Sequence, residues 1–137
     1  MSQLFSDIWM KHFQTEWNKD AELTQPLEKI NFNSIIGYGF PDEKSPRGLI
    51  IVKQGLVIDA GPYQGQSMNW DLRARENHWL EWLNREVGAT GFGLAYSTGK
   101  LKFVVGDYKS MIKIPEMARP FIKSFSAMGR ACAFWKH

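Results

Sequence analysis

The residue types that bind metals or act as nucleophiles are few in this sequence and lie far apart. The three histidines are His12, His78 and His137, and the single cysteine is Cys132. Zinc sites and nucleophilic sites need such groups in sets, for instance two histidines one helical turn apart or a cysteine beside a histidine. No such spacing occurs here, so we expect no metal site and no catalytic residue.

Two glycine pairs superficially resemble phosphate-binding loops. They are Gly37 with Gly39 and Gly91 with Gly93. Neither pair completes a GxGxxG or GxxxxGK[ST] pattern between a strand and a helix. We therefore interpret them as a twisted strand and a tight turn, and we expect no cofactor.

Asp71 is the acid best placed for general acid–base chemistry, because it lies in a predicted strand close to Arg73 and Arg75. A general base needs a perturbed pKa and a reacting proton within reach. An ion pair with Arg73 is the simpler interpretation. The alternative is a small cone-shaped α+β enzyme, or an accessory subunit, acting on a hydrophobic substrate. An enzyme would place Asp71 or Tyr38 in its pocket, and an accessory subunit would use the aromatic first helix or Phe134 and Trp135 as an anchor.

The length and composition are those of one globular domain, which we expect to span residues 1–137. Nine Phe, six Trp and four Tyr make up 14% of the chain, and each ring buries roughly 150–250 Å². This surplus either thickens the core or lines a cavity, and composition is compatible with both.

The same features bear on location. One cysteine gives no disulfide framework and fits a reducing compartment. The first residues lack the basic start and apolar run of a signal peptide, and no stretch reaches the roughly 18 apolar residues of a membrane span. We expect a cytoplasmic protein.

Charge is distributed unevenly along the chain. Residues 1–87 hold nine Lys and Arg against twelve Asp and Glu, whereas residues 88–137 hold eight against two. A basic, apolar-rich third indicates either an anionic partner, such as a lipid head group, an acyl-thioester or a membrane surface, or simply a solvated face. The basic residues form no dense patch with interleaved aromatics, so we expect no nucleic-acid partner.

Hydrophobic periodicity predicts an α+β fold with a five-stranded sheet covered on one face by about five helices. Helices are expected at residues 4–17, capped by Ser2, at 24–29, capped by Thr24, at 75–87, at 108–114, capped by Asp107, and at 121–128. Strands are expected at 32–40, 49–53, 56–60, 69–74 and 100–105, with a hairpin turn at Gln54 and Gly55. Residues 88–98 are expected to form a loop or a short loose helix, and Pro115 and Pro120 to interrupt the last helical stretch.

The last third carries the most informative apolar pattern. Alternation along 100–105 predicts one apolar strand face, and 108–128 predicts helical segments lying over it. Methionine adapts to several apolar shapes, so this layer either leaves an apolar tunnel or is ordinary core. The candidate ligand-binding residues are Phe92, Leu101, Phe103, Val105, Met111, Ile112, Met117, Phe121, Phe125 and Met128.

The order of these elements resembles the sterol carrier protein (type two) family. The resemblance covers about residues 4–128 and rests on GLIIVKQGLVIDA as the central hairpin, DLRARENHWLEWL as strand and middle helix, and STGKLKFVVGDYKSMIKI as the last strand and helix. These are patterns of apolar spacing and turns. The chain ends without a Ser-Lys-Leu-type peroxisomal signal, so the resemblance points to a stand-alone prokaryotic-type domain.

The resemblance implies non-enzymatic binding of a hydrophobic small molecule or lipid in a cavity between the sheet and the C-terminal helix. Fatty acids, acyl-thioesters, sterol-like molecules and hydrocarbons are the ligand classes it suggests. Four lysines, Lys100, Lys102, Lys109 and Lys113, are expected to attract an anionic head group at the mouth. We further expect a monomer or weak homodimer that makes transient contact with an anionic membrane surface.

Overall fold

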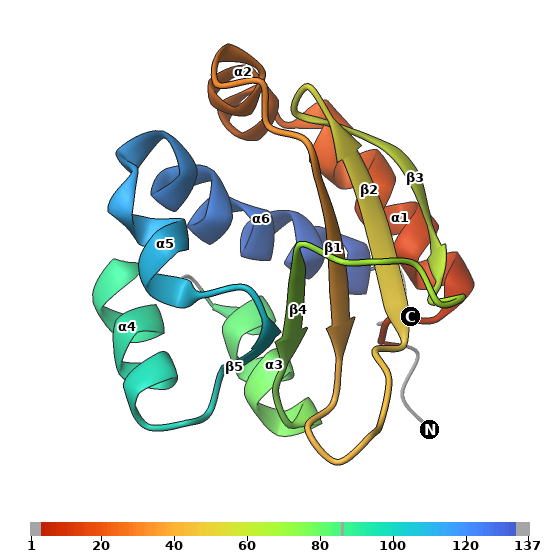
Figure 1. Ribbon diagram of the computed structural model, residues 1–137, viewed down its shortest axis with the longest axis vertical. Coiled ribbons are helices and arrows are strands. Elements are labelled where there is room, and N and C mark those ends of the chain that lie inside the picture. Colours follow the sequence, from red (N-terminus) through yellow and green to blue (C-terminus); the bar gives the residue numbers. More distant parts are fainter. Residues whose placement is uncertain (1–3, 86, 134–137) are drawn as a thin grey trace.

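A five-stranded sheet forms the middle of the molecule, as the computed structural model shows for residues 4–85 and 87–133 (Figure 1). Its strand order is β3-β2-β1-β4-β5. The central strands β1 and β4 run parallel, and the other neighbours are antiparallel. The strands are β1 Ser34–Gly39, β2 Gly48–Lys53, β3 Leu56–Pro62, β4 Trp70–Arg73 and β5 Lys102–Val105. The predicted α+β class and five-stranded sheet are confirmed.

Helices cover one face of this sheet and its β5 edge. In Figure 1, α1, α3 and α6 lie behind the strands, α2 lies at the top, and α4 and α5 lie beside β5. The helices are α1 Asp7–Lys19, α2 Ala21–Lys29, α3 Glu76–Asn84, α4 Ala89–Ser97, α5 Tyr108–Lys113 and α6 Pro115–Ala133. The described residues therefore hold six helices, one more than the approximate number expected.

The N-terminal helices begin at other residues than the sequence pattern predicts. Phe5 has a φ of 66°, which is incompatible with a right-handed helix, so α1 starts at Asp7 and not at residue 4. The Ser6 hydroxyl accepts a hydrogen bond from the Trp9 backbone N–H and caps α1. Ser2, the predicted cap, lies outside the described residues. Similarly, Asp20 caps α2 in place of Thr24.

The C-terminal helix is the largest departure from the prediction. Instead of an interrupted stretch that resumes at residue 121, α6 runs without a break from Pro115 to Ala133. Pro115 is its first residue, where a missing N–H costs nothing. Pro120 lies inside it and is buried. Packing of its long apolar face outweighs the one backbone hydrogen bond that Pro120 cannot make.

The glycine-rich segment forms a helix, α4, which is the second of the two expected alternatives, and the tight turn expected at Gly91 and Gly93 is wrong. Glycine destabilises an isolated helix by about 1 kcal/mol relative to alanine. Here Phe92 is fully buried and packs on Phe125, with ring centroids 4.3 Å apart. Tertiary burial of this ring stabilises a segment that has low intrinsic helix propensity.

Loops rather than helices cover the outer face of the sheet. The connection between β3 and β4 crosses this face in Figure 1. A Cβ atom at Gly37 would contact the Met68 sulfur and Pro46, so this glycine lets the loop approach the strand closely. The interpretation of the Gly37–Gly39 pair as part of a strand is confirmed.

Candidate functional site

The interior between the sheet and its helices is built mainly from aromatic rings on the α1 side. Phe5 precedes α1, and Trp9, Phe13 and Trp17 lie along one face of that helix; all four are buried in the core. Consecutive rings lie 5.3–5.8 Å apart. Tyr38 of β1 contacts both Phe5 and Phe13. This side of the interior is filled by interlocking rings.

The side beneath α5 and α6 contains a small apolar cavity of about 20 Å³. That volume exceeds a single water-sized probe sphere only slightly, so an alkyl chain does not fit this space as it stands. The expected tunnel stays a prediction. The cavity is lined by Trp17, Leu27, Phe32, Ile36, Tyr38, Leu72, Met111, Met117, Pro120, Phe121, Ser124 and Phe125. Apart from the polar groups on the Trp17 and Tyr38 rings, its one polar lining group is the Ser124 hydroxyl, which donates to the Phe121 carbonyl 2.6 Å away.

Four of the ten predicted ligand-binding residues line this cavity: Met111, Met117, Phe121 and Phe125. Another four belong to the surrounding packing. Phe92, Leu101 and Met128 are buried in the core, and Phe103 is half-buried against it. None of these four lines the cavity, but Phe92 and Phe103 pack against the lining ring of Phe121.

The remaining two, Val105 and Ile112, lie at the surface with 36% and 39% of their areas exposed. The predicted alternation fails because β5 pairs irregularly with β4: Leu72 faces Phe103 and Asp71 faces Val105, which leaves Val104 as an extra residue. Ile112 follows the buried Met111 on α5 and therefore turns outward.

The sequence pattern missed the lining residues contributed by α1, α2, β1 and β4. Ile36 and Tyr38 alternate on β1 with Gly37, and both point to the helices. Period-two alternation along residues 34–40 was the available signal, but it does not say which helix covers that face. Trp17 and Leu27 reach the cavity from α1 and α2, a contact that only the tertiary fold reveals.

The four lysines expected at one mouth occupy two places. Lys109 and Lys113 lie exposed on α5, next to the cavity-lining Met111. Lys100 and Lys102 line a polar surface cleft. The expectation that the four lysines attract an anionic head group stays a prediction.

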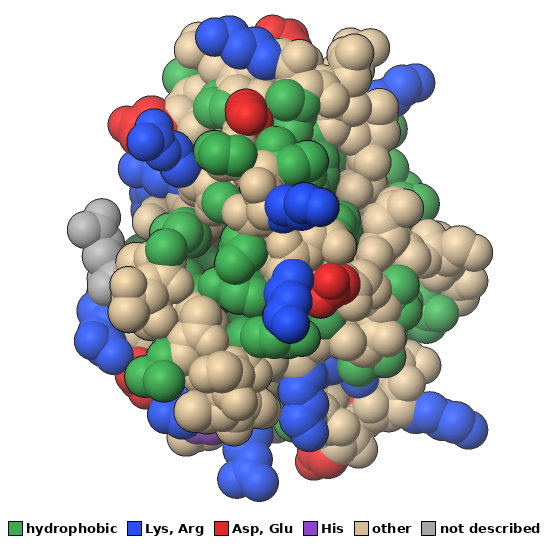
Figure 2. Space-filling model, turned by 60° about the vertical axis from the view of Figure 1, so that its left-hand side comes forward, with side chains coloured by type: hydrophobic (Ala, Val, Ile, Leu, Met, Phe, Trp, Pro, Cys, Tyr) green, Lys and Arg blue, Asp and Glu red, His purple; other side chains and the backbone are tan. Residues whose placement is uncertain are grey.

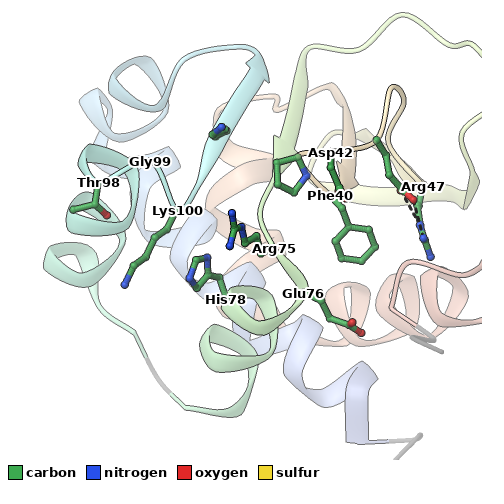
Figure 3. A pocket seen from close by; sticks show the side chains of 12 residues that line it. Phe40, Asp42, Arg47, Arg75, Glu76, His78, Thr98, Gly99 and Lys100 are labelled. Atoms are coloured by element: carbon green, nitrogen blue, oxygen red, sulfur yellow. Dashed lines mark hydrogen bonds and ion pairs between the residues drawn. The ribbon is translucent and has the colours of Figure 1, made fainter.

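This polar cleft has a volume of about 890 Å³ and lies between the β1–β2 loop, the start of α3 and the turn before β5. In Figure 3, Arg75, His78 and Lys100 are among the side chains that line it, and the Lys100 amine extends away from the other two. On the other side, Arg47 donates two hydrogen bonds to the Glu43 carboxylate, at 2.9 and 2.8 Å, which lowers the pKa of Glu43. Its open shape and charged lining do not suit an alkyl chain.

The groups suggested for an enzymatic alternative are already engaged or desolvated. Asp71 accepts two hydrogen bonds from the Arg73 guanidinium, at 2.6 and 2.9 Å, with both side chains buried. Arg73 also donates to the carbonyls of Phe40 and Glu43 and so anchors the β1–β2 loop. Burial raises the pKa of Tyr38 far above its ordinary range. The ion-pair interpretation of Asp71 is confirmed.

The C-terminal half of α6 is tied to the neighbouring helices by polar contacts. Arg130 donates from Nε to the buried Glu16 at 2.9 Å and from Nη2 to Asp20 at 3.1 Å. Gly129 packs directly against the Leu83 carbonyl of α3. Among the described residues, no ion pair holds the stretch 115–122. The part of α6 that closes the cavity is therefore held mainly by apolar contacts.

Within residues 4–85 and 87–133, no cluster of histidine, cysteine and acidic side chains could hold a metal ion. Over the same residues, no helix has both the length and the apolar character needed to cross a bilayer. Phe134 and Trp135, the anchor suggested for an accessory subunit, lie outside the described residues.

The arrangement of the sheet and its covering helices is that of the sterol carrier protein 2 fold. A crystal structure of sterol carrier protein 2 matches over 93% of this chain and 98% of its own, with a TM-score of 0.73 and 13% sequence identity. The resemblance inferred from the sequence is thus confirmed at the level of the fold.

Two further structures have the same fold. A solution structure from Thermus thermophilus, described as possibly a sterol carrier protein, covers 92% of this chain and 90% of its own, with a TM-score of 0.65 and 16% identity. A ubiquinone synthesis protein, UbiJ-SCP2, covers 87% and 86%, with a TM-score of 0.58 and 10% identity. No family model and no curated protein sequence matches the chain.

Proposed function

We propose that this protein binds and carries a hydrophobic ligand between the sheet and the α5–α6 layer, without catalysing a reaction on it. The observation that carries the proposal is the apolar cavity beneath α6, in a fold shared with sterol carrier protein 2. Its lining of methionine and phenylalanine suits an alkyl chain or a fused-ring ligand.

Binding requires the cavity to widen. The space of about 20 Å³ holds no alkyl chain, and the stretch of α6 that closes it carries the flexible Met117 and the helix-weakening Pro120. We propose that α5 and the N-terminal half of α6 move outward while Arg130 keeps the C-terminal half in place. A ligand then replaces the closed contacts of Met111, Met117 and Phe121 with its own apolar surface.

The ligand classes are fatty acids, acyl-thioesters, sterol-like molecules and hydrocarbons. Apolar burial would supply the affinity, so chain length should matter more than head-group chemistry. Each buried methylene contributes about 0.8 kcal/mol, which is roughly a fourfold change in affinity. Titration of the protein with fatty acids and acyl-thioesters of increasing length tests this. Absence of saturable binding, or affinity that does not change with length, would contradict the proposal.

A cavity-filling variant tests the location. Met117→Trp replaces a flexible side chain beneath α6 with a larger indole ring, and we expect this variant to bind ligand at least tenfold more weakly. Ile8→Trp adds the same ring at an exposed position of α1 and should leave affinity unchanged. Equal affinities for the two variants would show that the ligand binds elsewhere.

An accessory role is the second candidate, because the similar UbiJ-SCP2 structure is described as a ubiquinone synthesis protein. In that role the bound ligand would be a substrate presented to another protein. Mass measurement by size-exclusion chromatography, with and without residues 133–137, tests whether the C-terminal segment acts as an anchor for assembly.

A further inference from the structure

The exposed hydrophobic side chains of this protein concentrate in one short part of the chain. In residues 4–85 and 87–133, nine large hydrophobic residues are exposed, and five of these fall between residues 94 and 114. We call them the β5–α5 face: Leu94, Val104, Val105, Ile112 and Ile114. They lie on α4, β5 and α5 and on the junction that leads into α6.

Figure 2 looks onto this side of the molecule and shows hydrophobic side chains gathered over its middle, with Lys and Arg side chains beside them. Between residues 94 and 123 the chain has six Lys and Arg and two acids. One of these acids, Asp107, caps α5 by accepting from the Lys109 N–H and the Ser110 hydroxyl. Among the described residues, Lys102, Lys109 and Lys113 form no ion pair.

We propose that the β5–α5 face docks on an anionic bilayer surface, which brings the cavity beneath α6 to the source of its ligand. This rests on the proposed carrier function. The exposed aliphatic side chains would enter the boundary between head groups and acyl chains. The lysines would meet the anionic lipid phosphates and carboxylates, each contributing about a fivefold increase in affinity.

A lipid surface fits this face better than a protein partner does. Protein interfaces are depleted in lysine and rely on Trp, Tyr and Arg anchors, whereas this face exposes aliphatic residues among lysines. A second copy fits poorly too, because a two-fold contact would bring the same lysines together. The β5 edge is short and bulged at Val104, which makes it a weak template for strand pairing.

Proximity to the cavity supports the same choice. Met111 lines the cavity, and its neighbour Ile112 on α5 belongs to the docking face. The junction residue Ile114 directly precedes α6, whose first turns close the cavity. A bilayer that contacts α5 therefore lies against the element that must move for a ligand to enter.

The test compares co-sedimentation with phosphatidylcholine vesicles that contain or lack phosphatidylserine, at low and at high salt. We expect binding that requires phosphatidylserine and falls with salt. Val104→Asp and Ile114→Asp should each reduce binding at least tenfold. The matched control is Ile58→Asp on the opposite edge strand, where exposure is 57% against 60% for Val104, and it should bind as the unmodified protein does.

Lys109→Glu with Lys113→Glu should abolish the dependence on phosphatidylserine, whereas Lys53→Glu, at the end of β2, should not. Circular dichroism checks that every variant is folded, and fatty-acid titration is measured in parallel. Vesicle binding that is absent, or that does not depend on salt, refutes docking. Docking is also refuted if Val104→Asp and Ile58→Asp lose equal amounts of vesicle binding, or if the protein is a dimer that Val104→Asp dissociates. Intact ligand titration with no vesicle binding refutes docking alone, and vesicle binding without ligand titration refutes the carrier function alone.

Discussion

Two helical layers pack on the same face of the sheet and are built in opposite ways. The α1 layer is an unbroken series of rings, and its polar side chains also bond to the strands. Trp17 Nε1 donates to the Gly55 carbonyl at 2.9 Å, and the side chains of Gln14 and Asn18 donate to the Val57 carbonyl at 3.0 and 2.9 Å. This helix is joined to the β2–β3 hairpin along its length.

Among the described residues, the cavity-closing part of the α5–α6 layer has none of these side-chain bonds to the strands. Met111, Met117 and Pro120 meet the sheet across a small void, and Ile112 and Ile114 of the same segment are exposed. A filled interior gains dispersion contacts that a void forfeits. The comparison shows that hydrogen bonds join the α1 layer to the strands, whereas the cavity-closing stretch of the α5–α6 layer lies over a void. The second layer is therefore the one that we propose a ligand displaces.

Two buried methionines, one in each layer, give the most direct test of whether the two layers differ in packing. Met10 of α1 is 0% exposed and Met111 of α5 is 3% exposed. We expect Met10→Ala to cost about 3–4 kcal/mol of unfolding free energy, within the usual range for such truncations. Met111→Ala, beside an existing void and a movable helix, should cost about 1–2 kcal/mol. Urea unfolding of both variants measures the difference, and equal costs would show that the layers are equally well packed.

Amide hydrogen exchange compares the local stability of the two layers without a mutation. If α5 and residues 117–122 open independently of the rest, their amides should exchange about 10–100-fold faster than those of α1 and β1. A saturating fatty acid should then slow exchange in α5 and α6 and leave α1 unchanged. Uniform protection across both layers would contradict a locally opening α6.

The ion pairs of α6 predict a smaller effect that separates its two halves. Arg130→Ala removes one of the two cationic partners of the buried Glu16 and leaves Lys19, at 3.3 Å, as the other; it also removes the contact with Asp20. The variant should cost about 1–2 kcal/mol, because the buried carboxylate loses part of its compensation. Lys123→Ala loses only a contact with the exposed Glu22 and should cost less than about 0.5 kcal/mol. Thermal unfolding of the two variants compares them, and similar costs would mean that Arg130 does not hold α6.

The sequence predicts the structure of some regions better than that of others. The hairpin turn has a positive φ at Gly55, as its sequence predicts, and also at Gln54, where the sequence did not predict it. The Asp71–Arg73 pair also follows from the side-chain period of a strand, which places both groups on one face. These features depend on local geometry, which a single sequence contains.

The α5–α6 region depends on packing between distant segments, which local patterns do not contain. Helix α6 continues through Pro120, and α4 forms despite its glycines, because Phe92, Phe121 and Phe125 pack together. The bulge at Val104 shifts Val105 to the surface. Hydrophobic periodicity predicted the apolar residues that close the cavity. It did not predict the strand residues that face them, or how little space remains between the helices and the strands.

The smallest expected effect concerns Tyr38, which lies where the two layers meet. Burial raises the pKa of Tyr38, and burial also raises that of Tyr108 in α5. The pKa of Tyr38 in the folded protein lies above the value of about 10 in the unfolded chain. The stability that the protonated phenol contributes is therefore complete below about pH 10 and is lost as the pH rises above 10. By about pH 11 the loss should reach about 1 kcal/mol. Tyr38→Phe should remove this part of the alkaline destabilisation, measured as the difference between urea midpoints at neutral and alkaline pH. Tyr38 also lines the cavity, so a ligand that enters there should leave the Tyr38 phenol protonated. If the stability of Tyr38→Phe depends on alkaline pH as that of the unmodified protein does, water already reaches this ring.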